Sequence, residues 1–141
     1  MQVQPLTPAR AASRATGPVL LATFATPVDP RAERLAIESA IEAGLSLVLV
    51  NAIAMPHAPR SHRLELPSRA HQAVRATARR AARLGIRTEL LHVVSPRPAR
   101  AIVEIANERC AALLVLGRRT RRAARTIRNG TSCLIWSAGA D

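Results

Sequence analysis

The stretch LLVLGRRTRRAARTIRNGTSCLIW, residues 113–136, carries the pattern that decides the fold. A continuous apolar run ends at Gly117, six arginines follow, and a short apolar run closes the stretch. Short, nearly continuous apolar runs are typical of strands that are buried on both faces of a parallel sheet. Parallel strands need a crossover of about a dozen residues or more, which is usually helical. The stretch therefore predicts two parallel strands joined by a helix.

The same alternation of apolar runs and helical segments extends through the rest of the chain. The segment 29–44 has clear helix-end signals, with Asp29 as N-cap, Pro30 as the first helical residue and Gly44 beyond the last turn. Strands that alternate with helices indicate an α/β fold with an open, mainly parallel five-stranded sheet and helices on both faces. The predicted strands are 19–24, 45–54, 87–94, 111–117 and 133–136, and the predicted helices are 29–44, 69–85, 99–108 and 119–128.

The length of 141 residues fits a single domain. We expect residues 1–16, which are rich in Pro, Ala, Ser and Thr, to be a disordered lead-in, and residues 17–141 to form the domain. No apolar run approaches the roughly 18 residues of a membrane span, and the N-terminus lacks the apolar segment of a secretory signal. Cys110 and Cys133 show neither CxxC spacing nor paired histidines nearby. The sequence therefore predicts a cytoplasmic protein with no membrane partner, disulfide framework or zinc site.

The formal net charge of +12 comes entirely from arginine, since the chain has no lysine. Such a charge permits binding to nucleic acid, an anionic membrane or a phosphorylated ligand. Part of the excess also has a genomic explanation, because arginine and alanine both use GC-rich codons. The basic helices 69–85 and 119–128 could together form a phosphate-contacting surface, so nonspecific nucleic-acid binding is one alternative. Specific recognition is disfavoured, because there is no recognisable nucleic-acid-binding motif and only one Phe and one Trp to stack on bases.

Four segments carry a resemblance to a known family. VLLATFAT (19–26), PRPARAIVEIA (96–106), AALLVLG (111–117) and TIRNGTSCLIW (126–136) resemble, in their order and spacing, segments of the universal stress protein family. The resemblance covers about residues 17–137. It implies a Rossmann-like, adenine nucleotide alpha hydrolase-like fold, ATP binding in many members, and homodimers that often form through the last strand.

The chain departs from the ATP-binding members of that family at several positions. Those members use an Asp at the end of strand 1 and a Gly-x2-Gly-x9-Gly-Ser/Thr segment after strand 4. Phe24 stands at the position of the Asp, where its ring could occupy the space that an adenine would need. Pro96 and Arg97 replace the glycine and the Asp of a later turn, and Ala112 replaces an Asp common in strand 4.

The phosphate segment itself admits two placements. In one, Gly117, Thr120, Gly130 and Thr131 reproduce the family's spacing, with Thr120 in place of the second glycine. In the other, the glycine loop has been deleted and residues 119–128 form the last helix. A ten-residue helix spans about 15 Å, which matches the length of about 16 Å of a five-residue strand. The helix therefore takes all the residues of the crossover and leaves none for a phosphate loop. We favour the shortened loop, in which Gly130 caps the end of the helix.

Any ligand is expected at the switch point between strands 1 and 4, because open α/β sheets bind ligands beyond the carboxyl ends of their strands. The residues there are Ala25, Thr26, Gly117, Arg118 and Arg119. Four arginines between residues 118 and 122 crowd the positive end of the last helix, at a cost of about 0.3–1 kcal/mol each. Either this is a solvated face that tolerates the cost, or a bound phosphate or nucleotide relieves it.

Little in the sequence points to catalysis. There is no Gly-x-Ser-x-Gly elbow and no suggestive pair of carboxylates. His57 and His62 share a loop without further metal ligands, His92 is expected in the core or at an edge, and His71 at the surface. We therefore expect a non-catalytic stress-related or regulatory protein that has no cofactor or metal and a shortened phosphate loop. Two alternatives stay open: an atypical nucleotide or phosphate binder that uses arginines, with ATP as its ligand, and a basic nucleic-acid-associated module.

Overall fold

The computed structural model describes residues 17–24, 28–55, 68–117, 119 and 121–137. Its strands are β1 (Val19–Thr23), β2 (Leu47–Ala54), β3 (Thr88–Ser95), β4 (Leu113–Leu116) and β5 (Leu134–Ser137). Its helices are α2 (Pro30–Ala43), α3 (Ser68–Arg83), α4 (Pro98–Glu108) and α5 (Arg121–Gly130). Each predicted element is present, with both ends within two residues of their predicted positions. The predicted lead-in, residues 1–16, lies outside the described residues.

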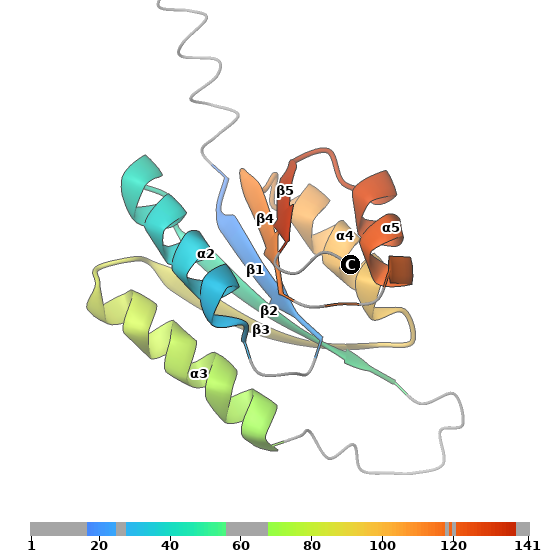
Figure 1. Cartoon of the computed structure of the whole chain (residues 1–141), viewed down its shortest axis with the longest axis horizontal. Coiled ribbons are helices and arrows are strands. Elements are labelled where there is room, and N and C mark those ends of the chain that lie inside the picture. The colour runs from blue at the N-terminus through green and yellow to red at the C-terminus, as the bar shows by residue number, and fades with distance from the viewer. Residues whose placement is uncertain (1–16, 25–27, 56–67, 118, 120, 138–141) are drawn as a thin grey trace, which may run out of the picture.

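The strands form one sheet in the order β3-β2-β1-β4-β5, and each neighbouring pair is parallel. The predicted open, parallel α/β sheet is therefore confirmed. Figure 1 shows α2 and α3 on one face of the sheet and α4 and α5 on the other. The switch point lies between β1 and β4, because the helices that follow these two strands cover opposite faces. None of the helices in the described part of the chain is long and apolar enough to cross a membrane.

Each face of the sheet has its own aliphatic core, because successive side chains of a strand point to opposite faces. In β1, Val19 and Leu21 pack beneath α2 and α3, whereas Leu20 and Ala22 pack beneath α4 and α5. Complete burial of a large aliphatic side chain contributes about 1.5–3 kcal/mol. The central strand β1 is therefore held by packing on both faces, which fixes the position of its carboxyl end.

The ends of α2 follow the predicted pattern. Asp29 Oδ1 accepts hydrogen bonds from the backbone N–H groups of Arg31 at 2.8 Å and Ala32 at 3.3 Å. Gly44 ends the helix in the left-handed region, with φ of 67°, and Gly85 follows α3 with φ of 86°. These are the conformations in which glycine is favoured at a helix end.

Gly130 does not serve as the C-capping glycine that the sequence predicted. It is the last residue of α5, and among the described glycines only Gly44 and Gly85 have a positive φ. A Cβ atom at position 130 would lie 2.8 Å from Val103 Cγ1 on α4. The Gly130 carbonyl also accepts a 2.9 Å hydrogen bond from Asn107 Nδ2. A glycine is needed here because α5 approaches α4 too closely for a side chain.

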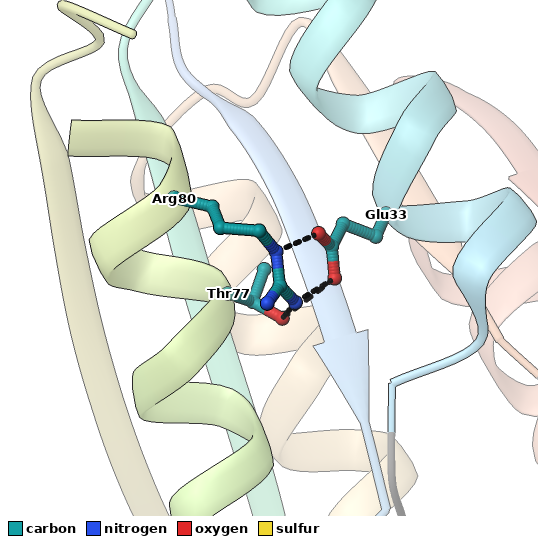
Figure 2. A network of polar contacts seen from close by, with 3 residues as sticks. All are labelled: Glu33, Thr77 and Arg80. Atoms are coloured by element: carbon teal, nitrogen blue, oxygen red, sulfur yellow. Dashed lines mark hydrogen bonds and ion pairs between the residues drawn. The ribbon is translucent and has the colours of Figure 1, made fainter. Parts of the chain in front are cut away.

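A polar cluster joins α2 to α3, the two helices on one face of the sheet. Figure 2 shows Thr77 and Arg80 of α3 both facing the Glu33 carboxylate of α2. Glu33 accepts hydrogen bonds from Thr77 Oγ1 at 2.7 Å, from Arg80 Nε at 2.7 Å and from Arg80 Nη2 at 2.8 Å. The hydrogen bonds from Arg80 hold the pKa of the Glu33 carboxyl below its usual value, against the opposing effect of burial. We call Glu33, Thr77 and Arg80 the helix clamp.

Candidate functional site

A cavity of about 1050 Å3 lies at the carboxyl end of the sheet, on the face covered by α4 and α5. Three parts of the chain surround it: the residue after β1, the corner between β3 and α4, and the start of α5. The lining residues are Phe24, Pro96, Arg97, Pro98, Ala99, Arg100, Arg119, Arg122, Ala123 and Thr126. This is the edge of the sheet where a doubly wound fold binds ligands.

The lining of the cavity carries positive charge only. Arg97, Arg100, Arg119 and Arg122 all line it, and none of the described lining residues is acidic. Arg119 is fixed in place, because its Nη2 donates a 3.0 Å hydrogen bond to Ser137 Oγ at the end of β5. A guanidinium group is the side chain best suited to bind phosphate or carboxylate oxygens. The cavity is therefore chemically suited to an anionic ligand.

Two helices begin at this cavity, and neither has an acidic residue in its first turn. Arg97 stands at the N-cap of α4 without a side-chain hydrogen bond to the helix, and α4 has no acidic residue in its first turn. The first turn of α5 also has no acidic residue, whereas α2 is capped by Asp29. The first N–H groups of a helix need an acceptor, and the helix dipole favours an anion there.

Phe24 lines the cavity and does not fill it. Its ring packs partly against the core beneath α4 and α5, and the cavity beside it still measures about 1050 Å3. That its ring could occupy the space an adenine needs stays a prediction. The side chain supplies an aromatic wall, and such a wall suits a flat apolar group.

The structure brings only some of the predicted site residues together. Arg119 lines the cavity, and Gly117 follows β4 at the switch point, where a Cβ atom would lie 3.3 Å from Asp29 Cβ. Thr131 lies beyond the far end of α5, and both its N–H and its hydroxyl donate to the Ile127 carbonyl, at 3.1 and 2.9 Å. Gly130 ends the same helix, away from the cavity. The other predicted positions, Ala25, Thr26, Arg118 and Thr120, lie outside the described residues.

Sequence reasoning missed the part of the cavity formed by the start of α4. Arg97 and Arg100 line it because β3 and β4 end at the same edge of the parallel sheet. The signal was available in the segment PRPAR (96–100), where two arginines flank the start of a helix without an acidic residue. Which helices share a face could not be read from the sequence, so these arginines were not connected with those of α5.

A second polar group crosses β1, β2 and β3 on the opposite face, beneath α3. Thr23 Oγ1 donates to Asn51 Oδ1 at 3.2 Å, and Asn51 Nδ2 lies 3.3 Å from His92 Nδ1. His71 of α3 stacks on His92, with ring centroids 4.3 Å apart and planes inclined by 14°. The prediction that His71 is a surface residue was wrong, because its Nδ1 atom is buried. Burial lowers the pKa of His92, and repulsion from His71 and Arg75 lowers it further.

The two basic helices do not form one surface. The core of α3 lies on the face that it shares with α2, whereas α5 packs on the opposite face with α4. The prediction of a joint phosphate-contacting surface from residues 69–85 and 119–128 was therefore wrong. The described residues also contain no cluster of three or more His, Cys, Asp or Glu side chains that could hold a metal ion.

Comparison with known proteins extends these observations. A model of the universal stress protein family matches residues 16–132. The universal stress protein from Archaeoglobus fulgidus in complex with dAMP is 23% identical, with a TM-score of 0.68 over 86% of this chain and 96% of that chain. A universal stress protein in complex with cAMP is 19% identical, with a TM-score of 0.63 over 90% and 100% of the two chains. A family member from Arabidopsis thaliana with AMP bound is 13% identical, with a TM-score of 0.54 over 85% and 90%.

No curated protein matches the sequence. At these identities, the solved structures show that the fold is shared. The family model gives the stronger result, because residues 16–132 are most of the chain and include all the strands except β5. The segments that suggested the resemblance thus lie on the matching fold, and the chain belongs to the universal stress protein family.

Proposed function

We propose that this chain is a non-catalytic, cytoplasmic regulatory protein of the stress response that binds a phosphorylated small molecule through arginine side chains. The observation that carries the proposal is the cavity of about 1050 Å3 at the switch point, with four arginines and no acidic residue among its described lining residues. The solved structures named above hold dAMP, cAMP and AMP. An adenine nucleotide is therefore the first ligand to test.

The proposal includes a phosphate loop that is shortened and no longer functional. Only residues 118–120 stand between Gly117 and the start of α5 at Arg121. Gly130 and Thr131, which reproduce the family's spacing, belong to the far end of that helix. A ten-residue helix is about 15 Å long, so these two residues are too far from the cavity to hold a phosphate. Arginines take over the role that backbone N–H groups have in a glycine loop.

The energetics support an anion at this position. Each arginine near a helix N-terminus costs about 0.3–1 kcal/mol when no anion is present. A hydrogen bond to a charged group contributes about 1.5–3 kcal/mol, so a phosphate held by two arginines more than offsets that cost. An anion held beside α4 would also accept hydrogen bonds from the uncapped N–H groups at the start of that helix.

Isothermal titration with ATP, AMP, dAMP and inorganic pyrophosphate tests the proposal. We expect saturable binding that weakens by about tenfold in Arg122→Gln, because each tenfold loss corresponds to about 1.4 kcal/mol. Arg128→Gln is the matched control, since Arg128 is an exposed arginine of the same helix outside the cavity. Absence of binding to every probe at millimolar concentration, or an equal loss in both variants, would contradict it.

We also propose that the chain forms a homodimer through β5. This strand ends the sheet order, so one of its edges has no partner strand among the described residues, and Leu134 is 74% exposed. Exposed apolar edge strands require cover. Sedimentation should show a dimer for the wild type and a monomer for Leu134→Lys, and a monomeric wild type would overturn this assignment.

A further inference from the structure

The arginines of the cavity fall into two groups on separate walls. Arg97 and Arg100 come from the corner between β3 and α4, and Arg119 and Arg122 from the corner between β4 and α5. We call these pairs the α4 wall and the α5 wall. Two strands, β2 and β1, lie between β3 and β4 in the sheet. Three strand spacings of about 4.8 Å place the two corners about 14 Å apart.

An aromatic side chain lies between the walls. Phe24, which follows β1, lines the cavity, whereas the apolar lining residues Pro98 and Ala99 belong to α4 and Ala123 belongs to α5. The sheet order puts β1 between β3 and β4, so the aromatic ring stands between the two arginine pairs. The cavity thus offers two cationic walls with an aromatic side chain between them.

We infer that the cleft prefers ligands that carry phosphate groups at two separated positions, such as a nucleoside 3′,5′-bisphosphate, over nucleotides with a single phosphate chain. This inference rests on the proposed function and adds the ligand class. In a di- or triphosphate chain, successive phosphates share bridging oxygens, so the charge is concentrated at one end of the molecule. Such a chain neutralises one wall and leaves the other wall without a phosphate. Phosphates on the 3′ and 5′ oxygens of one ribose place a dianionic group toward each wall, with the ribose between them.

Both walls need an anion for the same reason. The helix that begins at the α4 wall has no side-chain cap and no acidic first turn, and the helix at the α5 wall has no acidic first turn either. Each wall therefore combines two guanidinium groups with the positive end of a helix dipole. Both walls are cationic and lie at the start of a helix, and this argues against a ligand with charge at one end.

Titration calorimetry with adenosine 3′,5′-bisphosphate and with ATP tests the inference, because the two probes have the same base and comparable total charge. We expect the bisphosphate to bind at least about tenfold more tightly than ATP, which corresponds to about 1.4 kcal/mol. Arg100→Gln, in the α4 wall, and Arg122→Gln, in the α5 wall, should each weaken the bisphosphate by about tenfold. AMP has one phosphate, so one of the two substitutions should weaken AMP binding and the other should change it little.

Arg128→Gln again serves as the control, and thermal melting of each variant verifies that it is folded. Equal or tighter binding of ATP, or a bisphosphate affinity that responds to one wall only, would overturn the inference and leave the proposed function standing. Absence of binding for all three nucleotides would overturn both. A preference for the bisphosphate that is lost in each single-wall variant supports the inference, because a general attraction to negative charge would not discriminate between probes of comparable charge.

Discussion

At the scale of single residues, the close approach of Gly130 to Val103 determines how α5 packs on α4. We predict that Gly130→Ala destabilises the protein, because the new Cβ atom would lie 2.8 Å from Val103 Cγ1. Valine in a helix has one strongly preferred rotamer, so it cannot easily turn away. Overpacking of this kind costs about 1–3 kcal/mol, which outweighs the gain of up to about 1 kcal/mol from a better helix former. Urea denaturation measures the change in the free energy of unfolding.

The companion variant Val103→Ala separates overpacking from other causes. With the valine methyl groups removed, Gly130→Ala should be neutral or stabilising, so the two changes should couple by at least about 1 kcal/mol. Additive effects in the double variant would show that the close approach is not the reason for the glycine.

Two residues show why individual roles were harder to predict than element types. Gly130 was predicted to cap α5, whereas it is needed for the close approach to α4. A left-handed cap and close helix packing both select glycine, so the residue type alone does not show which of the two applies. His71 was predicted at the surface because its helix is rich in arginine, yet its ring stacks on His92. The two histidines are 21 positions apart in the sequence and lie on different elements. The periodicity of one helix therefore carries no information about their contact.

At the scale of elements, the helix clamp of Glu33, Thr77 and Arg80 connects two helices that follow different strands. We predict that Glu33→Ala lowers the free energy of unfolding by about 2 kcal/mol. The substitution leaves the buried Thr77 hydroxyl without the acceptor that now lies 2.7 Å away, and an unsatisfied buried polar group costs about 1–3 kcal/mol. Arg80 contributes less, because half of its side chain is exposed and water can replace the lost carboxylate.

Two further variants sharpen this prediction. Glu38→Ala, an exposed position on the same helix, should change stability little. Glu33→Gln should cost less than Glu33→Ala, because its amide oxygen can still accept the hydrogen bond from Thr77. If Glu33→Ala and Glu38→Ala were equally stable, the clamp would have no role in holding α2 and α3 together.

At the scale of the whole molecule, the strand order was implied only by the family resemblance, while the alternation of strands and helices could be read directly. Buried parallel strands have apolar runs, and capped helices between them have end signals at Asp29, Gly44 and Gly85. The face that each helix covers depends on the three-dimensional path of the chain. For that reason, the start of α4 was missed as part of the cavity, and α3 and α5 were wrongly combined into one surface.

The pH dependence of folding connects several parts of the molecule. Burial, with repulsion from His71 and Arg75, lowers the pKa of His92, so the unfolded chain binds a proton at this position more readily than the folded protein does. Stability is therefore highest above the ordinary histidine pKa of about 6.5 and falls as the pH drops below it. The hydrogen bonds from Arg80 and Arg109 lower the pKa values of Glu33 and Glu89, which adds a second loss of stability at more acidic pH.

We predict that His92→Gln removes the first loss and leaves the second. The glutamine carbonyl oxygen can accept from Asn51 Nδ2, which now lies 3.3 Å from His92 Nδ1, and the side chain does not titrate. Urea denaturation between about pH 8 and pH 5 should show a falling free energy of unfolding for the wild type and a flat one for the variant. Both proteins should lose stability together at lower pH, where Glu33 and Glu89 take up protons. A wild-type profile that is flat in the first window, or a variant that keeps the same slope there, would show that the His92 imidazole is not the group that titrates. In the folded protein, neutral His92 accepts from Asn51 and stacks on His71, so its protonation opposes both contacts and weakens the attachment of α3 to the sheet.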